Sequence, residues 1–342
     1  MVNFTSSPIL VTGGAGFIGS HFVREWVKKE KSPVITLDSL TYAGNLENLS
    51  ELKENDLHRF VRGSIMDVPT VVDILETERP WALLNFAAQT HVDRSIANAE
   101  DFVETNIVGT YRLLEAVRAY LSKATSDKRD RFRFLQISTD EVYGSLSAEE
   151  KAASEIAPYA PRNPYAATKA ASDLITKAWG HTYDLPILTV NGSNTYGPCQ
   201  FSEKLIPLVI SNCLSELELP IYGDGKQIRD WLYVEDFCAA LRSVLFHGQC
   251  HESYNIGGEC QKTNLEIVFH ICALLDKEYP RRNGTPYADL IKYVLDRPGH
   301  DRRYALDIAK IRSELGWKPK ISLQEGLSRT VGWFLEKERR KN

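Results

Sequence analysis

A glycine-rich turn near the N-terminus is the feature that most constrains the fold of this 342-residue chain. Residues 8–12 (PILVT) predict a short buried strand, and residues 13–19 (GGAGFIG) follow it directly. Apolar residues at helical spacing then continue to Val27. Strand, glycine turn and helix in this order are typical of a parallel sheet that binds a dinucleotide. The turn lets the backbone approach a pyrophosphate, and the helix N-terminus offers free N–H groups.

A carboxylate at the end of the next predicted strand indicates which dinucleotide is bound. Residues 33–37 (PVITL) form that strand, and Asp38 ends it, 19 residues after Gly19. A carboxylate at this position accepts hydrogen bonds from both adenosine ribose hydroxyls and repels a 2′-phosphate. The sequence therefore predicts NAD rather than NADP as the cofactor.

Further apolar runs alternate with helical patterns along the first half of the chain. Strands are predicted at residues 60–62, 81–86, 132–137 and 186–190, a long helix at residues 102–121, and a polar loop at residues 122–131. This alternation predicts an α/β fold with a Rossmann-type doubly wound parallel sheet. Residues 63–67 are either an adenine contact or an ordinary turn. His91 is expected to pack or to cap a helix rather than to act in catalysis.

Two neighbouring carboxylates, Asp140 and Glu141, follow the fifth predicted strand at the sheet edge where ligands bind. Taken alone, such a pair also suits a helix N-terminus or a solvated loop. Tyr165, which lies 25 residues after Asp140, and Lys169 favour a functional site. Residues four apart share a helix face, so Lys169 is expected beside the Tyr165 hydroxyl, where an ammonium stabilises the phenolate and lowers the pKa of the tyrosine.

After residue 190 the regular alternation loosens, and the pieces predict a smaller, discontinuous lobe. A turn is predicted at residues 194–198, short strands near residues 220–222, 228–233 and 254–256, and helices near residues 204–214, 234–245, 265–275, 307–314 and 323–335. We predict a dinucleotide-binding domain at residues 1–190 and a substrate lobe at residues 191–342, with some segments returning to the first domain. The cleft between the lobes would be the site.

Basic residues near turns of this lobe could clamp a diphosphate, or could be ordinary surface charge. They are Lys204, Arg229, Arg297, Arg302 and Arg303.

Composition excludes several other classes of protein. The formal charge of −4 gives no electrostatic footprint for nucleic acid, and no apolar run reaches the length of a membrane span. The six cysteines form no CxxC pair, so we expect free thiols and neither a metal site nor a disulfide framework. The N-terminal residues lack the pattern of a secretory signal, and the expected location is the cytoplasm.

With these motifs assembled, the chain resembles the extended short-chain dehydrogenase/reductase family. Within that family it is similar to the nucleoside-diphosphate-glucose 4,6-dehydratases, most closely those that act on dTDP-glucose. The segments STDEVYG and DRPGH are specific to this branch. The resemblance spans nearly the whole chain through TGGAGFIG (12–19), LTYAGNL (40–46), AAQTHVDRSI (87–96), STDEVYG (138–144), YAATK (165–169), EKLIPL (203–208), RDWLYVED (229–236) and DRPGHDRRYA (296–305).

The resemblance implies a hydro-lyase reaction of deoxysugar biosynthesis that uses NAD. Tyr165 would take the proton of the carbon 4 hydroxyl while NAD takes the hydride, and Thr139 would hydrogen-bond near carbon 4. Glu141 would then remove the carbon 5 proton as general base, and Asp140 would protonate the departing carbon 6 hydroxyl as general acid. Return of the hydride to carbon 6 gives a 4-keto-6-deoxyglucose nucleotide. Lys169 completes the catalytic set.

The resemblance also assigns binding residues. The implied cofactor contacts are Gly13, Gly16, Phe17, Ile18, Gly19, Asp38, Ile65, Ala87, Ala88, Thr105, Tyr165, Lys169 and Thr195. The implied nucleotide-sugar contacts are Thr90, Thr139, Asn194, Lys204, Leu205, Pro220, Tyr222, Arg229, Asn264, Arg297 and His300.

Some positions depart from the family pattern, although none of them removes a catalytic group. Ser64 stands where the family usually has Asp, Gln89-Thr90 replaces Glu-Ser, and Thr195 replaces Asn. Because Gln-Thr also resembles plant-type UDP-glucose dehydratases, UDP-glucose is the alternative substrate, and a related 4-epimerase is the alternative enzyme. The family implies a homodimer, and the helix at residues 102–121 is the candidate contact face.

Overall fold

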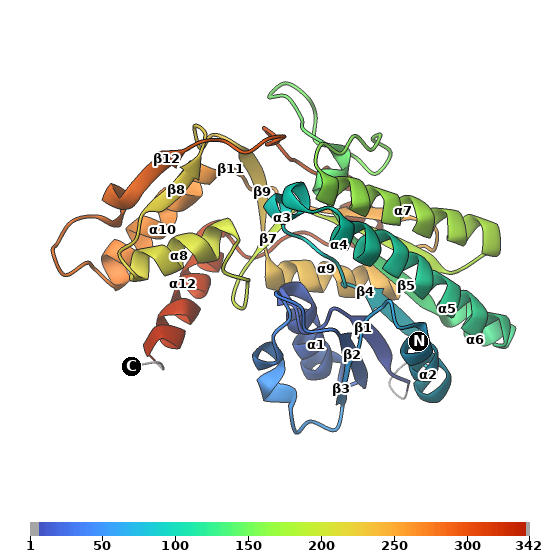
Figure 1. Cartoon of the computed structure of the whole chain (residues 1–342). Helices are drawn as coiled ribbons and strands as arrows, with labels where there is room; N and C mark the ends of the chain where they lie inside the picture. Colours follow the sequence, from blue (N-terminus) through green and yellow to red (C-terminus); the bar gives the residue numbers. More distant parts are fainter. Residues whose placement is uncertain (1–6, 340–342) are drawn as a thin grey trace.

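The computed structural model describes residues 7–339, which fold into a larger and a smaller lobe (Figure 1). A seven-stranded sheet forms the centre of the larger lobe, with the strand order β10-β6-β5-β4-β1-β2-β3 and parallel pairing throughout. These strands are β1 (Ile9–Thr12), β2 (Val34–Asp38), β3 (His58–Arg62), β4 (Ala82–Asn85), β5 (Arg133–Thr139), β6 (Ile187–Gly192) and β10 (Ser253–Ile256).

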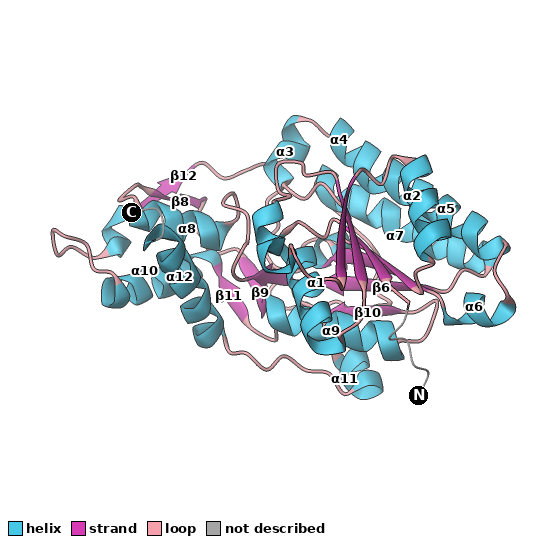
Figure 2. Ribbon diagram, turned by 90° about the horizontal axis from the view of Figure 1, so that it is seen from below, coloured by secondary structure: helices cyan, strands magenta, loops and turns pink. Residues whose placement is uncertain are grey.

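Helices cover both faces of this sheet, which explains why its central strands are mostly apolar (Figure 2). Ile9 and Val11 of β1 point into the core on one face, and Leu10 points into the core on the other. The first face is covered by α1 (Phe17–Glu30), α9 (Val234–His247) and α11 (Ala309–Leu315). The second face is covered by α2 (Val68–Glu78), α5 (Thr110–Ser122) and α7 (Pro164–Tyr183).

The strand order reverses at β1, which pairs with β2 on one side and with β4 on the other. At such a point the loops that leave neighbouring strands turn in opposite directions and open a crevice at the carboxyl ends of the strands. The glycine turn follows β1, Asp38 ends β2, and Asp140 follows β5. The topology therefore places these motifs at one edge of the sheet.

The smaller lobe has its own apolar core and two small sheets. One sheet joins β7 (Asn194–Tyr196), β9 (Ile228–Tyr233) and β11 (Gln261–Thr263), and the other joins β8 (Leu219–Tyr222) and β12 (Ile291–Val294). Its helices are α8 (Leu205–Leu214), α10 (Asn264–Glu278) and α12 (Leu323–Arg339). Short helices elsewhere are η1 (Leu46–Leu52), α3 (Val92–Ala97), α4 (Glu100–Phe102), α6 (Ser126–Arg131), η3 (Asp140–Tyr143) and η4 (Tyr287–Leu290).

The chain passes between the lobes more than once. After β9, helix α9 returns to pack beside α1, and β10 adds an edge strand to the large sheet next to β6. Helix α11 then packs on α9 and β10. The division at residues 190 and 191 stays a prediction. Within residues 7–339, no helix combines the length and the apolar composition that a membrane span requires.

Three predicted elements were wrong. The turn predicted at residues 194–198 contains strand β7, which forms because Asn194–Tyr196 pairs with β9. The polar loop at residues 122–131 contains α6, where an ion pair joins Arg131 to Asp127 four residues earlier. The helix at residues 102–121 is interrupted, because η2 (Val103–Gly109) is a π-helix between α4 and α5. The residues of β7, α6 and η2 show no strong hydrophobic periodicity, so the sequence pattern did not predict these elements.

Candidate active site

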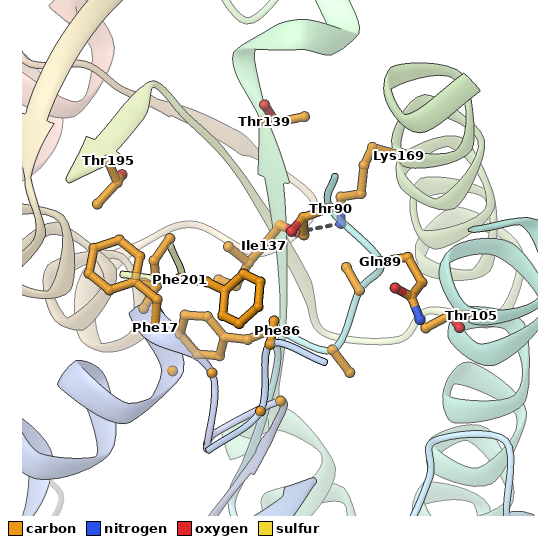
Figure 3. Close-up of a pocket in the computed structure, with 18 of the residues that line it drawn as sticks. Phe17, Phe86, Gln89, Thr90, Thr105, Ile137, Thr139, Lys169, Thr195 and Phe201 are labelled. Carbon is orange, nitrogen blue, oxygen red and sulfur yellow. Dashed lines mark hydrogen bonds between the residues drawn. The ribbon is translucent and has the colours of Figure 1, made fainter. Parts of the chain in front are cut away.

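A cavity of about 480 Å³ lies at the carboxyl edge of the large sheet, where the smaller lobe meets it (Figure 3). All of the predicted catalytic and cofactor residues line it. Four of the predicted nucleotide-sugar residues also line it: Thr90, Thr139, Asn194 and Lys204. The other seven, Leu205, Pro220, Tyr222, Arg229, Asn264, Arg297 and His300, do not.

The glycine turn has the shape of a pyrophosphate cradle. Gly13 has a φ of +70°, and a Cβ added there would lie 2.7 Å from the backbone nitrogen of Ala87. Glycine is therefore required at this position. Gly16 is the N-cap residue of α1 and leaves the first N–H groups of that helix without a side-chain cap. A dinucleotide pyrophosphate fits this helix N-terminus, because its charge complements the helix dipole.

Asp38 is fixed by the same turn. Its two carboxylate oxygens accept hydrogen bonds from the backbone nitrogens of Ala15 (2.9 Å) and Leu40 (2.8 Å). Burial raises the pKa of Asp38, and these two hydrogen bonds oppose that rise because they stabilise the ionised form. Each oxygen keeps a further lone pair for a ribose hydroxyl, so the residues present fit NAD.

Lys169 is buried, and its Nζ donates a hydrogen bond to the backbone oxygen of Ile137 at 2.7 Å (Figure 3). Burial lowers its pKa, and the charge of Asp173 opposes that effect. The predicted effect of Lys169 on Tyr165 was wrong for this structure. The pKa of Tyr165 lies well above its ordinary value, because the phenol is buried and the negative charge of Glu141 lies nearby.

Asp140 and Glu141 occupy opposite environments in η3. Asp140 is 3% exposed, and its Oδ1 accepts a hydrogen bond from the Thr139 hydroxyl at 3.2 Å. Its Oδ2 has no hydrogen-bond partner among residues 7–339. Burial and the charge of Glu141 hold the pKa of Asp140 well above its usual range, so this carboxyl favours the protonated form.

Glu141 instead has hydrogen-bond donors at its carboxyl group. Its Oε2 accepts hydrogen bonds from Asn163 Nδ2 at 3.2 Å and from the Tyr304 hydroxyl at 3.4 Å. The pair thus contains one acid that tends to keep its proton and one carboxylate held by donors. That arrangement suits a general acid beside a general base.

Sequence reasoning missed three residues that support these groups. Asn163 caps α7, whose first turn contains Tyr165, and the single Tyr304 hydroxyl proton is shared between Glu141 and Asp301, whose Oδ2 is closer, at 2.5 Å. Asn106 is buried and holds Gln89 through two backbone hydrogen bonds, of 2.8 and 3.1 Å. Tyr304 lies within the segment DRPGHDRRYA, so that motif could have identified it. Asn106 lies in the π-helix and carries no comparable signal.

Several predicted substrate residues gather around Lys204 and Arg297. Lys204 is partly buried and donates to the Thr90 backbone oxygen at 2.9 Å, and desolvation lowers its pKa. Arg297 pairs with Asp93 at 3.2 Å and lies over the ring of Tyr222. His300 Nε2 is 3.3 Å from an Arg297 nitrogen. That Lys204 and Arg297 clamp a diphosphate stays a prediction.

The remaining predicted substrate residues have structural contacts. Arg229 lies over the Tyr304 ring and donates to the Asp301 backbone oxygen at 3.0 Å. Leu205 and Asn264 begin α8 and α10, and Pro220 lies in β8. Their contact with substrate stays a prediction.

Residues that differ from the family pattern form hydrogen bonds with residues close to them in the sequence. Ser64 lines the cavity, and its hydroxyl accepts a hydrogen bond from the Met66 nitrogen at 3.1 Å. Thr195 lines the cavity and donates to the Ser193 backbone oxygen at 3.2 Å. The prediction for His91 is confirmed, since it caps α3 by accepting from the Arg94 nitrogen at 3.2 Å.

Comparisons with known proteins agree with this geometry. The model of a family described as GDP-mannose 4,6 dehydratase matches residues 10–330. The dTDP-glucose 4,6-dehydratase of Xanthomonas campestris pv. campestris (strain B100) is 54% identical over 326 residues, covering 95% of this chain and 92% of that protein. The dTDP-glucose 4,6-dehydratase of Streptomyces venezuelae, solved with NAD and TYD bound, is 41% identical, with a TM-score of 0.88 and coverage of 97% and 98%.

Enzymes with a different activity share the fold. The UDP-glucose 4-epimerase of Thermotoga maritima, solved with UDP-glucose, is 30% identical to this chain, with a TM-score of 0.84 and coverage of 97% of this chain and 99% of that one. The backbone alone therefore does not distinguish a dehydratase from an epimerase, and the side chains of the cavity must do so.

Proposed function

Because this chain belongs to the GDP-mannose 4,6-dehydratase family, we propose from its site that it is an NAD-dependent nucleotide-sugar 4,6-dehydratase acting on dTDP-glucose. The product is dTDP-4-keto-6-deoxyglucose. The observation that carries this function is the Asp140–Glu141 pair, held in opposite environments in one cavity with Tyr165 and Lys169. An epimerase has no use for an acid–base pair aimed at carbons 5 and 6.

The glycine turn and Asp38 would hold the dinucleotide, and Lys169 and Thr195 line the same cavity. Bound NAD supplies the chemistry of a hydride acceptor at carbon 4 and a hydride donor at carbon 6. Tyr165 takes the proton of the carbon 4 hydroxyl, and the resulting ketone makes the proton on carbon 5 acidic. The protein's remaining task is to move protons to and from carbons 5 and 6.

Glu141 removes the carbon 5 proton, with its carboxyl group held in place by contacts to Asn163 and Tyr304. Asp140 gives its proton to the departing carbon 6 hydroxyl, so that water rather than hydroxide leaves. Glu141 then returns its proton to carbon 5.

This proton balance leaves Tyr165 with one proton more and Asp140 with one fewer than at the start of the cycle. The Thr139 hydroxyl hydrogen-bonds to both groups and offers a path that resets them. A Thr139→Val variant that completes later turnovers as fast as its first one would rule out this path.

A product assay tests the function. The purified protein, incubated with dTDP-glucose, is expected to form a 4-keto-6-deoxy sugar, which gives a chromophore in alkali, whereas a 4-epimer does not. Competition among dTDP-glucose, UDP-glucose and GDP-mannose tests the choice of nucleotide. If the protein consumes UDP-glucose in preference to dTDP-glucose, the proposed substrate is wrong, and the proposed 4,6-dehydratase reaction is retained.

The Asp140→Asn and Glu141→Gln double variant tests the assigned roles. It keeps the shapes of both side chains but removes the acid and the base, so elimination should stop while some oxidation at carbon 4 persists. The absorbance of the reduced nicotinamide and the absence of the alkali chromophore measure these two outcomes. Product formation at the wild-type rate would contradict the roles. Asp73→Asn, an exposed carboxyl on α2, is the control.

The assembly and location belong to the same proposal. We propose a homodimer that is located in the cytoplasm. Large apolar side chains are exposed on α3, η2, α5 and α7, and these helices would form the contact between the two subunits. The exposed side chains are Ile96, Val103, Tyr111, Leu174 and Tyr183. Sedimentation of the protein and of a Leu174→Glu variant tests the dimer. A wild-type monomer at micromolar concentration would refute it.

A further inference from the structure

Helix α7 carries four ionisable residues at intervals of four, starting at the active site. Tyr165 and Lys169 line the cavity, and Asp173 and Lys177 continue along the same face. Asp173 is wholly buried and does not line the cavity, whereas Lys177 reaches a separate crevice at the surface. Asp173 therefore lies directly behind Lys169, away from substrate and cofactor.

The hydrogen bonds of Asp173 do not account for a buried charge. Its Oδ2 accepts from the Ser138 hydroxyl at 2.5 Å and from the Tyr159 hydroxyl at 3.2 Å. Its Oδ1 has no hydrogen-bond partner within residues 7–339. A neutral side chain with the same shape could keep the two neutral contacts at a lower desolvation cost. A carboxyl at this position needs an explanation that depends on its charge.

Burial raises the pKa of Asp173, and the positive charge of Lys169 is the largest effect that opposes this rise. Lys169 and Lys177 lie one turn away on either side, and the titratable groups facing it from outside the helix are Tyr159 and Tyr143. Lys169 loses stabilisation through burial, and Asp173 is the charge that opposes this loss. The carbonyl of Ile137, which accepts from Nζ, can fix the direction of the side chain but carries no net charge.

We propose that Asp173 is a positioning residue that keeps Lys169 in its ammonium form and so acts on the reaction through Lys169. Only the expected effect of Asp173 on the reaction rate rests on the proposed function; its effect on the charge of Lys169 does not. Without Asp173, Lys169 would become neutral at lower pH and would no longer place a positive charge on the helix face that it shares with Tyr165.

A direct test follows the charge of Lys169. In protein labelled with ¹³C at the lysine Cε, the Lys169 resonance is identified by its loss in Lys169→Met and is titrated with pH. Asp173→Asn is expected to move the titration midpoint to lower pH. Tyr159→Phe removes one contact of Asp173 but keeps the charge, and it should leave the midpoint in place. If Asp173→Asn does not fold, Asp173→Ser is the second neutral variant, with the same expected shift. A midpoint that stays unchanged in a folded neutral variant overturns the proposal.

Kinetics separate this role from a merely structural one. Asp173→Asn is expected to lower kcat by about tenfold at neutral pH, while KM changes by less than about twofold. An equal loss in Tyr159→Phe would assign the effect to hydrogen bonding and refute the role of the charge. If the wild type forms no 4-keto-6-deoxy product, the proposed function fails, yet the titration of Lys169 still decides the role of Asp173.

Discussion

Asp140 is placed in an environment that disfavours its ionised form. It is buried beside the charge of Glu141, and one of its oxygens has no hydrogen-bond partner within residues 7–339. Such sites are built for chemistry at the expense of stability, because a catalytic acid needs a raised pKa. Two sequence neighbours that would look equivalent in a loop are thereby given different chemical tasks.

We expect Asp140→Asn to be more stable than the wild type at neutral pH, by about 1–3 kcal/mol. Below the ordinary pKa of 3.8 the carboxyl is protonated in both the folded and unfolded states. As the pH rises above that value, the unfolded chain ionises first, so the wild type loses stability until the raised folded pKa is passed. The stability difference between the two proteins should therefore vanish in acid.

Urea unfolding at neutral and acid pH measures this difference. Asp73→Asn, which changes an exposed carboxyl on α2, provides the control and should show little change at either pH. An Asp140→Asn variant less stable than the wild type at neutral pH would contradict the prediction.

At the same scale, we expect Asp38 to determine which dinucleotide is bound. In Asp38→Asn, the loss of charged hydrogen bonds to the ribose should weaken NAD binding by about tenfold or more. Removal of the repulsion should allow NADP to bind measurably. Equilibrium binding of both dinucleotides to cofactor-free protein measures the change. Glu47→Gln, an exposed change on η1, is the control, and an unaltered NAD affinity in Asp38→Asn would contradict this use of Asp38.

Among the elements, the π-helix Val103–Gly109 departs most from its sequence pattern. A π-helix carries one residue more per turn than an α-helix and is frequent at functional sites. Here it places Thr105 at the cavity and turns Asn106 inward to Gln89 and to Thr168, which Asn106 contacts at 2.9 Å. The extra residue therefore connects the cofactor site to α7.

Deletion of Glu104, an exposed residue of this segment, should convert the π-helix into a regular α-helix. Asn106 would rotate away from Gln89, and we expect NAD affinity to fall by about tenfold, equivalent to the loss of one or two hydrogen bonds. Circular dichroism should stay nearly unchanged. Deletion of Lys128, exposed in α6, is the control. Wild-type affinity after deletion of Glu104 would show that the irregularity has no such role.

At the scale of the whole molecule, the core under the large sheet is built from both ends of the chain. Residues 9–27 pack in one cluster with Phe237, Leu241, Ile256 and Trp317. Strand β10 also covers the edge of β6. The first 190 residues thus contain the glycine turn and the predicted catalytic residues, but later residues supply part of the core on one face of the sheet.

We therefore expect a fragment of residues 1–190 not to fold alone, because it would expose this apolar face and an unpaired strand edge. Limited proteolysis and circular dichroism of the fragment measure this. Co-expression with residues 191–342 should restore a protease-resistant, NAD-binding complex. A fragment that resists proteases and binds NAD without its partner would show that the first domain is independent of the second.

The sequence alone determined the elements whose signals are local. Strand, glycine turn and helix at residues 8–27, and apolar runs bounded by turns, predicted the large sheet, because backbone geometry and burial on both faces restrict which residues can occupy these positions. Likewise, the spacing of Tyr165 and Lys169 and the position of Asp140 and Glu141 identified one site, since the carboxyl ends of parallel strands meet at one edge.

Tertiary structure alone decided what depends on neighbours distant in sequence. Strand β7 exists because β9 pairs with it, and the π-helix turns Asn106 toward a loop that lies 17 residues earlier. The raised pKa of Asp140, the donors on Glu141 from Asn163 and Tyr304, and the charge of Asp173 behind Lys169 all arise from burial and from contacts between separate elements. A sequence pattern records which groups are present. Their charge depends on how much water the folded chain leaves around each of them.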